Sequence, residues 1–336
     1  VVSPGRVPLR KRDNDLMGLV PAPGWDARYD WQGFIPAAQT PRETQPARGW
    51  IASANQRIHG NDYPYYLTSE WALPYRQQRI EQLLRARDKH SIGDMAAMQA
   101  DVLSLATQRL LPWPQRARSE HALAAAAEAA LKNFNGEMRA DDSAPLIFWA
   151  WSRQLVRAVF TDELGGPAVY ERVLGARSFR DALEGVLERN DAWWCDDKTT
   201  PDKAETCEQM SAIALTRALD ELQRRFGADV SKWRWGDAHV ARSEHRPFSR
   251  IKALAPLFEL RVPTGGDTYT LNVGRVGVKP DGTTGELYLN EHAPSLRAIY
   301  DLGELSQSRV MQSSGPSGLP WLRQYRSFAG PWARVE

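Results

Sequence analysis

Helix-forming patterns fill only the middle of this chain, between residues 68 and 232, and strand patterns lie on both sides. Short apolar segments separated by proline-rich turns, such as Tyr29–Pro36, come before this block, and similar segments return after it. Such segregation is typical of α+β architecture, with a large helical insertion between strands of one sheet system. Because the sequence shows no repeat and no linker, we expect one domain in three parts: residues 1–67, 68–232 and 233–336.

The middle part contains several segments with helical periodicity. The first helix is expected to start near Ser69, and Ser91 is expected to cap the second. Apolar residues then recur from Met95 to Leu110, and further helices are predicted over Ala122–Leu131, Pro145–Phe160, Phe179–Leu187 and Ser211–Phe226. In the third part, strands are predicted over Pro256–Pro263, Tyr269–Val273, Leu296–Leu302 and Arg309–Gln312.

Composition and charge narrow the class of partner. The net charge is only +2, from 43 basic and 41 acidic residues, so neither nucleic acid nor an anionic membrane is indicated as a partner. No apolar run approaches the roughly 18 residues that a transmembrane helix needs. The sequence has no signal peptide and does not begin with Met, so we expect it to be a processed or excised piece of a longer protein.

Two cysteines, Cys195 and Cys207, enclose a short, polar, turn-rich loop. Neither a histidine nor a second cysteine pair accompanies them, which favours a disulfide over a metal site. A disulfide would indicate an oxidising compartment. Two free thiols are the alternative.

The segment Gly49–Ile58 reads as a strand lined with small residues. Ile51, Ser53 and Asn55 fall on one face, and Asn55 stands where the strand runs out. A carboxamide at such a position can donate a hydrogen bond to charge that develops on a substrate. It can also tie down a neighbouring loop, and for Asn55 taken alone this structural role is the favoured interpretation.

Other motifs for catalysis or metal binding are weak. The sequence has no glycine-rich phosphate loop and no His-Glu-x-x-His helix. His239 and His245 are six residues apart with acids nearby, but structural hydrogen bonding is favoured over a metal site. Ser317 lies in Gly315–Gly318, which is not a Gly-x-Ser-x-Gly nucleophile elbow and is predicted to be a turn.

Several short segments, in a specific order and spacing, carry a family resemblance over nearly the whole sequence. They are Pro23–Trp25, Asp30–Pro36, Gly49–Gln56, Asp62–Pro64, Trp71 with Tyr75-Arg76, Trp235–His239, Leu296–Asp301 and Gly315–Gly318. Together they resemble the penicillin acylase family of N-terminal-nucleophile hydrolases, specifically the later part of the catalytic β chain. The resemblance implies a stacked αββα sandwich and hydrolysis of a linear amide. The implied substrate is a small acyl amide, either a β-lactam antibiotic or an N-acyl homoserine lactone.

In that family a serine exposed by autocatalytic cleavage is the nucleophile, and its own α-amine is the base. The resemblance assigns Asn55 to the oxyanion hole and Arg76 to holding Asn55 in place. It implies no cofactor for catalysis. The family's structural calcium draws mainly on acids upstream of the matched segments, so no calcium ligand is assigned here, although the region of Asp62 could contribute.

The nucleophile itself is expected outside this chain, because Val1 is not a catalytic residue and Ser3 has no family-like context. The expected partner is therefore the remainder of the same precursor, namely the α chain and the first part of the β chain. This chain alone is expected to be inactive, and the parent protein to be periplasmic or secreted. The alternative is a non-catalytic, acylase-like binding or scaffold protein.

Overall fold

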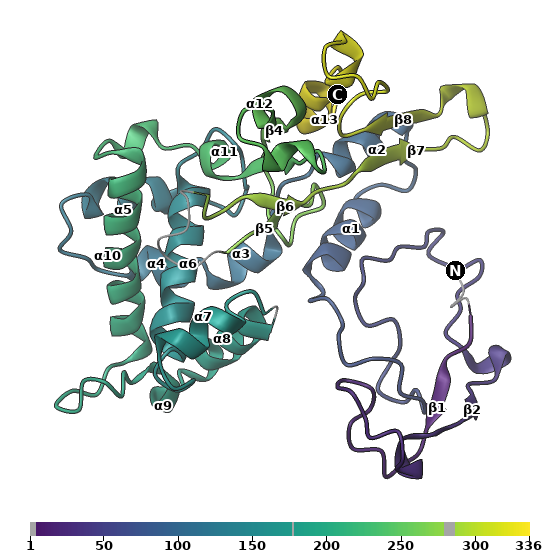
Figure 1. The fold of residues 1–336 in the computed structure, drawn as a ribbon, viewed down its shortest axis with the longest axis horizontal. Coiled ribbons are helices and arrows are strands. Elements are labelled where there is room, and N and C mark those ends of the chain that lie inside the picture. The colour runs from purple at the N-terminus through teal and green to yellow at the C-terminus, as the bar shows by residue number, and fades with distance from the viewer. Residues whose placement is uncertain (1–4, 177, 279–285) are drawn as a thin grey trace. The chain divides into compact units, whose positions relative to one another are not determined.

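The computed structural model describes residues 5–176, 178–278 and 286–336 (Figure 1). Val1 and Ser3 therefore lie outside the described residues. The chain divides into two compact units, Val1–Leu84 and Arg85–Glu336, where the sequence predicts one domain. The boundary falls at the end of a continuous helix, α1 (Tyr75–Arg85), so no linker marks it in the sequence.

The first unit has little regular structure. β1 (Pro8–Arg10) and β2 (Trp31–Phe34) pair antiparallel, as the alternating segments predict, and a long loop leads from β2 to α1. The helix begins at Tyr75 and not near Ser69. The reason is Pro74, whose ring disfavours helical backbone at the residue before it.

The prediction of a strand over Gly49–Ile58 is wrong. This segment lies in the long loop and pairs with no strand of the described chain. Its side chains nevertheless alternate as expected, with Ala54 buried and both Ser53 and Asn55 exposed. An extended loop keeps the two-residue alternation of side chains, but a strand also requires a neighbour for its backbone hydrogen bonds.

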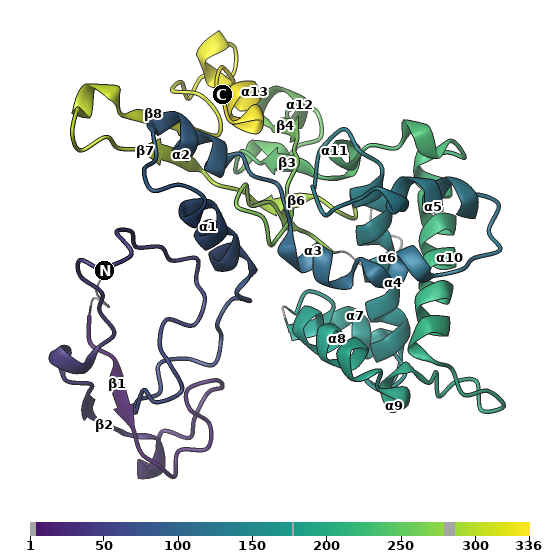
Figure 2. The ribbon, with the colours of Figure 1, turned by 180° about the vertical axis from the view of Figure 1, so that it is seen from behind.

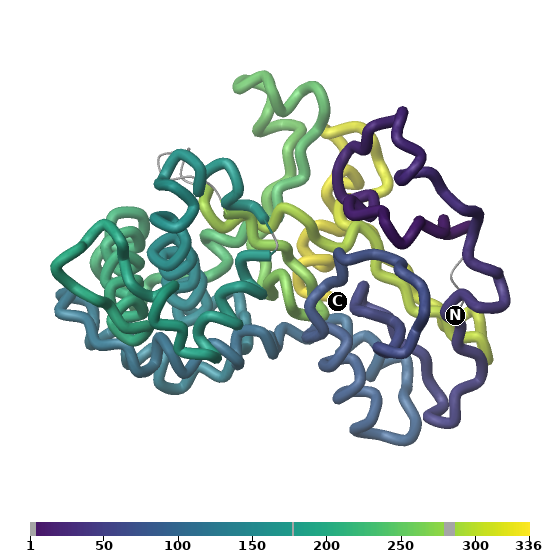
Figure 3. The backbone as a smooth tube through the Cα atoms, turned by 90° about the horizontal axis from the view of Figure 1, so that it is seen from below, coloured from purple at the N-terminus to yellow at the C-terminus, as the bar shows by residue number. Residues whose placement is uncertain are grey.

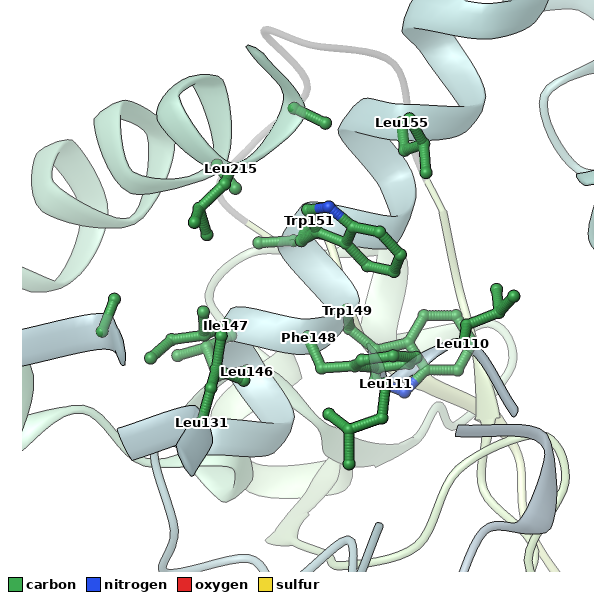
Figure 4. Packing of buried hydrophobic residues seen from close by; sticks show 14 of the residues in the cluster. Leu110, Leu111, Leu131, Leu146, Ile147, Phe148, Trp149, Trp151, Leu155 and Leu215 are labelled. Atoms are coloured by element: carbon green, nitrogen blue, oxygen red, sulfur yellow. The ribbon is translucent and has the colours of Figure 1, made fainter. Parts of the chain in front are cut away.

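Helix α6 (Ala144–Phe160) is the centre of the second unit. It is buried everywhere except at Val156 and Arg157, and its polar residues Ser152, Arg153 and Gln154 are buried with the apolar ones. Helix α10 (Cys207–Phe226) packs along it. Figure 4 shows Phe148 and Trp149 gathered with Leu110 and Leu111, and Leu146 and Ile147 beside Leu131. The apolar and aromatic stripes of the helical block therefore form its core, as predicted.

The remaining helices are α2 (Ile92–Gln99), α3 (Leu105–Leu110), α4 (Pro112–Arg116), α5 (Ala124–Lys132), α7 (Pro167–Val173), α8 (Ser178–Arg189), α9 (Ala192–Cys195), α11 (Trp235–Ala238), α12 (Ala255–Phe258) and α13 (Ala329–Arg334). Most of them lie in the predicted block, but α11, α12 and α13 lie after it, in the part predicted to form strands. Ser91 caps α2 in a capping box with Asp94. The apolar pattern from Met95 to Leu110 divides between α2 and α3, because Ser104 starts a second helix by capping the amide of Thr107.

The strands of the second unit lie after the helical block, as predicted. A four-stranded sheet has the order β4-β3-β6-β5, in which β3 and β6 are parallel and the other neighbours antiparallel. Its strands are β3 (Val240–Ser243), β4 (Leu260–Pro263), β5 (Arg275–Val276) and β6 (Asn290–His292). A separate hairpin pairs β7 (Leu296–Ile299) with β8 (Arg309–Gln312), which confirms that predicted pair. Within this unit, Figures 2 and 3 show the helices around α6 at the opposite end from the hairpin.

Two predicted strands of this part need correction. The first half of Pro256–Pro263 is helix α12, and only its second half is a strand. Tyr269–Val273 is a turn, because Asp267 accepts the backbone N–H of Tyr269 and Thr270 accepts that of Asp267. Such side-chain bonds offer the backbone an alternative to a strand ladder.

A buried ionic cluster ties the helical core together. The carboxylate of Glu221 on α10 accepts hydrogen bonds from Arg153 (2.6 Å), Gln154 (2.8 Å) and the hydroxyl of Tyr288 (2.6 Å). All four side chains are buried. A carboxylate in this environment is tolerated because charged and neutral donors surround it.

The predicted disulfide is present. Cys195 at the end of α9 is bonded to Cys207 at the start of α10, and both residues are buried. Thr206 and Gln209 form a capping box beside it, so the first turn of α10 is fixed both covalently and by hydrogen bonds. None of the helices in the described ranges has both the length and the apolar character needed to cross a membrane.

Candidate active site

Asn55 lies at a bend of the long loop in the first unit. Its backbone adopts a left-handed conformation with φ of 65°, which asparagine tolerates better than most residues. Its carbonyl accepts a hydrogen bond from the amide of Ala72 at 3.0 Å. Ala54, directly before it, is buried, whereas the Asn55 side chain is exposed. The loop thus has a packed inner side and presents the carboxamide outward.

Arg76, in the first turn of α1, holds this carboxamide. Its Nη2 donates to Oδ1 of Asn55 at 3.0 Å and to the carbonyl oxygen of Ala54 at 2.9 Å. Burial lowers the pKa of Arg76, but a guanidinium stays charged at neutral pH. Because arginine can only donate, its partner atom must be the oxygen of the amide, and the Nδ2 donors of Asn55 point elsewhere. The structure therefore brings together the two residues that the resemblance pairs.

The chemistry of this arrangement is that of a fixed hydrogen-bond donor. Nδ2 of Asn55 has no hydrogen-bond partner among the described residues. A donor held in advance at the place where negative charge develops stabilises a transition state without reorganising. No hydroxyl or thiol of the described residues is bonded to Asn55 or Arg76, so the geometry supplies a donor and not a nucleophile.

Gln56 belongs to this site but is not identified by sequence reasoning. Its Oε1 accepts the backbone N–H of Ala54 at 2.9 Å. The alternation of side chains along the loop could have identified it, because Gln56 is a polar residue on the inward side, which it shares with Ala52 and Ala54.

His239 has the structural hydrogen bond that the sequence favours, whereas the buried Nδ1 of His245 has no hydrogen-bond partner among the described residues. His239 is fully buried, stacks on Trp235 with ring centroids 4.5 Å apart, and bonds through Nδ1 to the carbonyl of Tyr288 at 2.8 Å. Burial lowers the pKa of His239 to about 4, so it is neutral at pH 7. His245 stacks on Phe248.

No metal site emerges among the residues that the structure describes. In those ranges, His, Cys, Asp and Glu side chains nowhere gather in a group of three or more that could hold an ion. Among the described residues, neither the two histidines nor Asp62 takes part in such a group.

Ser317 lies in the turn that the sequence predicts. Its Oγ accepts the backbone N–H of Leu319 at 3.1 Å, which is a local turn contact. Gly315 packs so closely against the backbone of Gln324 and Tyr325 that a side chain would not fit there. No histidine among the described residues is hydrogen-bonded to Ser317, so a conventional serine hydrolase site is not supported.

The second unit contains a cleft of about 660 Å³. Arg242 and Arg261 stand opposite each other on β3 and β4, and Glu259 accepts from both, at 2.9 Å and 2.7 Å. Burial opposes ionisation of Glu259, but the two guanidiniums keep its pKa below the usual value. Glu286 also pairs with both arginines, so the two guanidiniums are engaged by two carboxylates of the sheet.

Comparisons with known proteins identify a family and a fold for the chain. A profile described as "Penicillin amidase" matches residues 1–336. "Acyl-homoserine lactone acylase QuiP" of Pseudomonas aeruginosa is 30% identical over 365 aligned positions, covering 98% of this chain and 41% of that protein. "Penicillin acylase 2 proenzyme" of Pseudomonas sp. is 29% identical, covering 98% of this chain and 40% of that protein.

A solved structure of thermostable penicillin G acylase from Alcaligenes faecalis shares the fold, with a TM-score of 0.55 and 18% identity. The likeness covers 79% of this chain and 51% of that one, and confirms the predicted α+β, N-terminal-nucleophile hydrolase class. The chain spans about two fifths of the length of the curated relatives.

Proposed function

The chain belongs to the penicillin amidase family, and from this premise we propose that it is part of an enzyme that hydrolyses linear acyl amides. The observation that carries the proposal is the hydrogen bond from Arg76 to Oδ1 of Asn55, which leaves the Nδ2 donors available. The similar proteins named for acyl-homoserine lactone and penicillin support an N-acyl homoserine lactone or a β-lactam antibiotic as the substrate.

In the proposed reaction an N-terminal serine, located in a part of the precursor outside this chain, attacks the amide carbonyl carbon. The carbonyl oxygen then gains negative charge, and Nδ2 of Asn55 donates a hydrogen bond to it. Arg76 touches no reacting atom and acts by fixing the orientation of Asn55. When the tetrahedral intermediate collapses, the C–N bond breaks and the amine leaves with the proton that the serine's α-amine took from the attacking hydroxyl. Water then attacks the acyl-serine ester, which releases the carboxylic acid and restores the serine hydroxyl.

The remainder of the same precursor is the proposed partner, and autocatalytic cleavage the proposed route to the serine. The Cys195–Cys207 disulfide supports a periplasmic or secreted location, because such bonds persist in oxidising compartments. No cofactor is proposed for the chemistry, and a structural calcium, if the full-length protein binds one, is proposed to use ligands from outside this chain.

The test is turnover by the full-length, processed protein on a panel of N-acyl homoserine lactones and β-lactam acyl amides. Asn55→Ala should lower kcat about 100-fold or more, with KM changed less than about twofold, because the lost donor acts in the transition state. Asn61→Ala is the matched control, since Asn61 is an exposed asparagine of the same loop. Unchanged kcat in a folded Asn55→Ala protein would refute the role, and a wild type without turnover on any amide would favour the scaffold alternative.

A further inference from the structure

Between Ala52 and Gln56, the inward row of the loop contains one polar side chain, the half-buried Gln56. Ala52 and Ala54 face inward, Ser53 and Asn55 face outward, and Gln56 follows in the inward row. A carboxamide removed from water needs a hydrogen-bond partner, and Gln56 has one in the backbone N–H of Ala54, at 2.9 Å from its Oε1. This bond accounts for a polar residue at an inward position.

The same bond spans the left-handed residue. Ala54 and Gln56 flank Asn55, whose φ of 65° lies in a region that residues other than glycine rarely occupy. The N–H of Ala54 is held by Gln56, and its carbonyl oxygen is held by Arg76 at 2.9 Å. Both polar atoms of the residue before Asn55 are thus fixed by side chains.

We propose that Gln56 is a second positioning residue for the oxyanion donor, a role that rests on the proposed function of Asn55. Arg76 fixes the end of the Asn55 side chain, and Gln56 fixes the backbone that carries it. Without the Gln56 bond the loop can relax away from its left-handed turn, and Nδ2 of Asn55 moves with it. Because small displacements of a catalytic group reduce rates strongly, this motion lowers kcat.

Three variants of the full-length, processed enzyme separate this role from simple loop stability. Gln56→Leu keeps the size and removes the acceptor, and should lower kcat about tenfold with KM changed less than twofold. Gln56→Glu keeps an acceptor oxygen and should stay within about twofold of wild-type kcat. Gln78→Leu is the matched control, because Gln78 is exposed on α1 and its side chain has no hydrogen bond to another described residue.

A double-mutant cycle shows whether Gln56 acts through Asn55. In an Asn55→Ala background, Gln56→Leu should change kcat less than about twofold, because no donor remains to be positioned. A tenfold loss in both backgrounds would overturn the proposal, as would a Gln56→Leu enzyme with wild-type kcat. Unchanged kcat in Asn55→Ala alone would instead refute the proposed function, so the two failures are distinguishable.

Hydrogen exchange at the Ala54 amide tests the bond without turnover. In the wild type this amide should be protected, and Gln56→Leu should speed its exchange about tenfold or more while Gln56→Glu should not. If Gln56→Leu does not fold, the wild-type measurement still decides: an unprotected Ala54 amide would overturn the proposal.

Discussion

Acidification should destabilise the second unit through His239. In the folded chain this ring is fully buried, and its pKa is lowered from 6.5 to about 4, mainly by burial. Its Nδ1 is bonded to the carbonyl of Tyr288, so the neutral ring donates from Nδ1 and carries no proton at Nε2. Protonation at Nε2 would place a charge inside the core, where Nε2 has no hydrogen-bond partner among the described residues.

The size and sign of the effect follow from proton linkage. The pKa of His239 is lower in the folded state, so the unfolded state binds more protons, and stability is lost as the pH falls from 6.5 toward 4. The lowering of the pKa from 6.5 to about 4 corresponds to about 3 kcal/mol when the loss is complete. Most of this loss, about 2–3 kcal/mol, falls between pH 7.5 and 4.5.

Urea unfolding followed by tryptophan fluorescence, at pH 7.5 and 4.5, measures this loss. The comparison is with His239→Asn, which does not titrate and retains a donor for the carbonyl of Tyr288. The variant should be less stable at pH 7.5, because it lacks the stacking on Trp235, but its stability should fall about 2–3 kcal/mol less on acidification. Equal losses in the two proteins would refute the assignment of a buried, neutral His239.

Three further predictions concern stability and use the same unfolding measurement. Replacing both Cys195 and Cys207 by alanine removes a cross-link between residues 12 positions apart and should cost about 3 kcal/mol, whereas the wild type under reducing agent should approach the variant. Glu221→Leu leaves buried donors without their acceptor and should cost about 3–5 kcal/mol; a neutral effect would contradict the role of the cluster. Gly315→Ala places a methyl group against the carbonyl of Gln324 and should cost about 1–3 kcal/mol, while Gly318→Ala, where space is open, should cost less than about 1 kcal/mol.

Much of the helical block could be predicted because its signals are local. Apolar periodicity identifies α6 and α10, and a capping serine identifies the start of α2. The strands were harder to predict, because a strand needs a second strand to pair with, and that strand can lie far away in the sequence. Tyr269–Val273 has the side chains of a strand, yet local bonds from Asp267 and Thr270 fold it into a turn.

In the candidate site, too, contacts between residues that are distant in the sequence could not be predicted from local patterns. Residues alone favoured a structural role for Asn55, and its tie to Arg76, 21 positions away, was expected only from the family resemblance. The hydrogen bond between them is present, and the catalytic role of Asn55 remains a prediction. Gln56 was missed because its partner is a backbone amide, and no residue pattern identifies which amide a glutamine side chain will reach.

The left-handed backbone at Asn55 has a consequence for the range of amino acids that this position can accept. Glycine and aspartate also tolerate such a conformation, but neither carries an amide N–H donor on its side chain. Alanine or leucine would lack the donor and also strain the turn. If this one position is varied to all amino acids, selection for stability should enrich asparagine, glycine and aspartate over alanine, which still folds, and selection for turnover should retain asparagine alone.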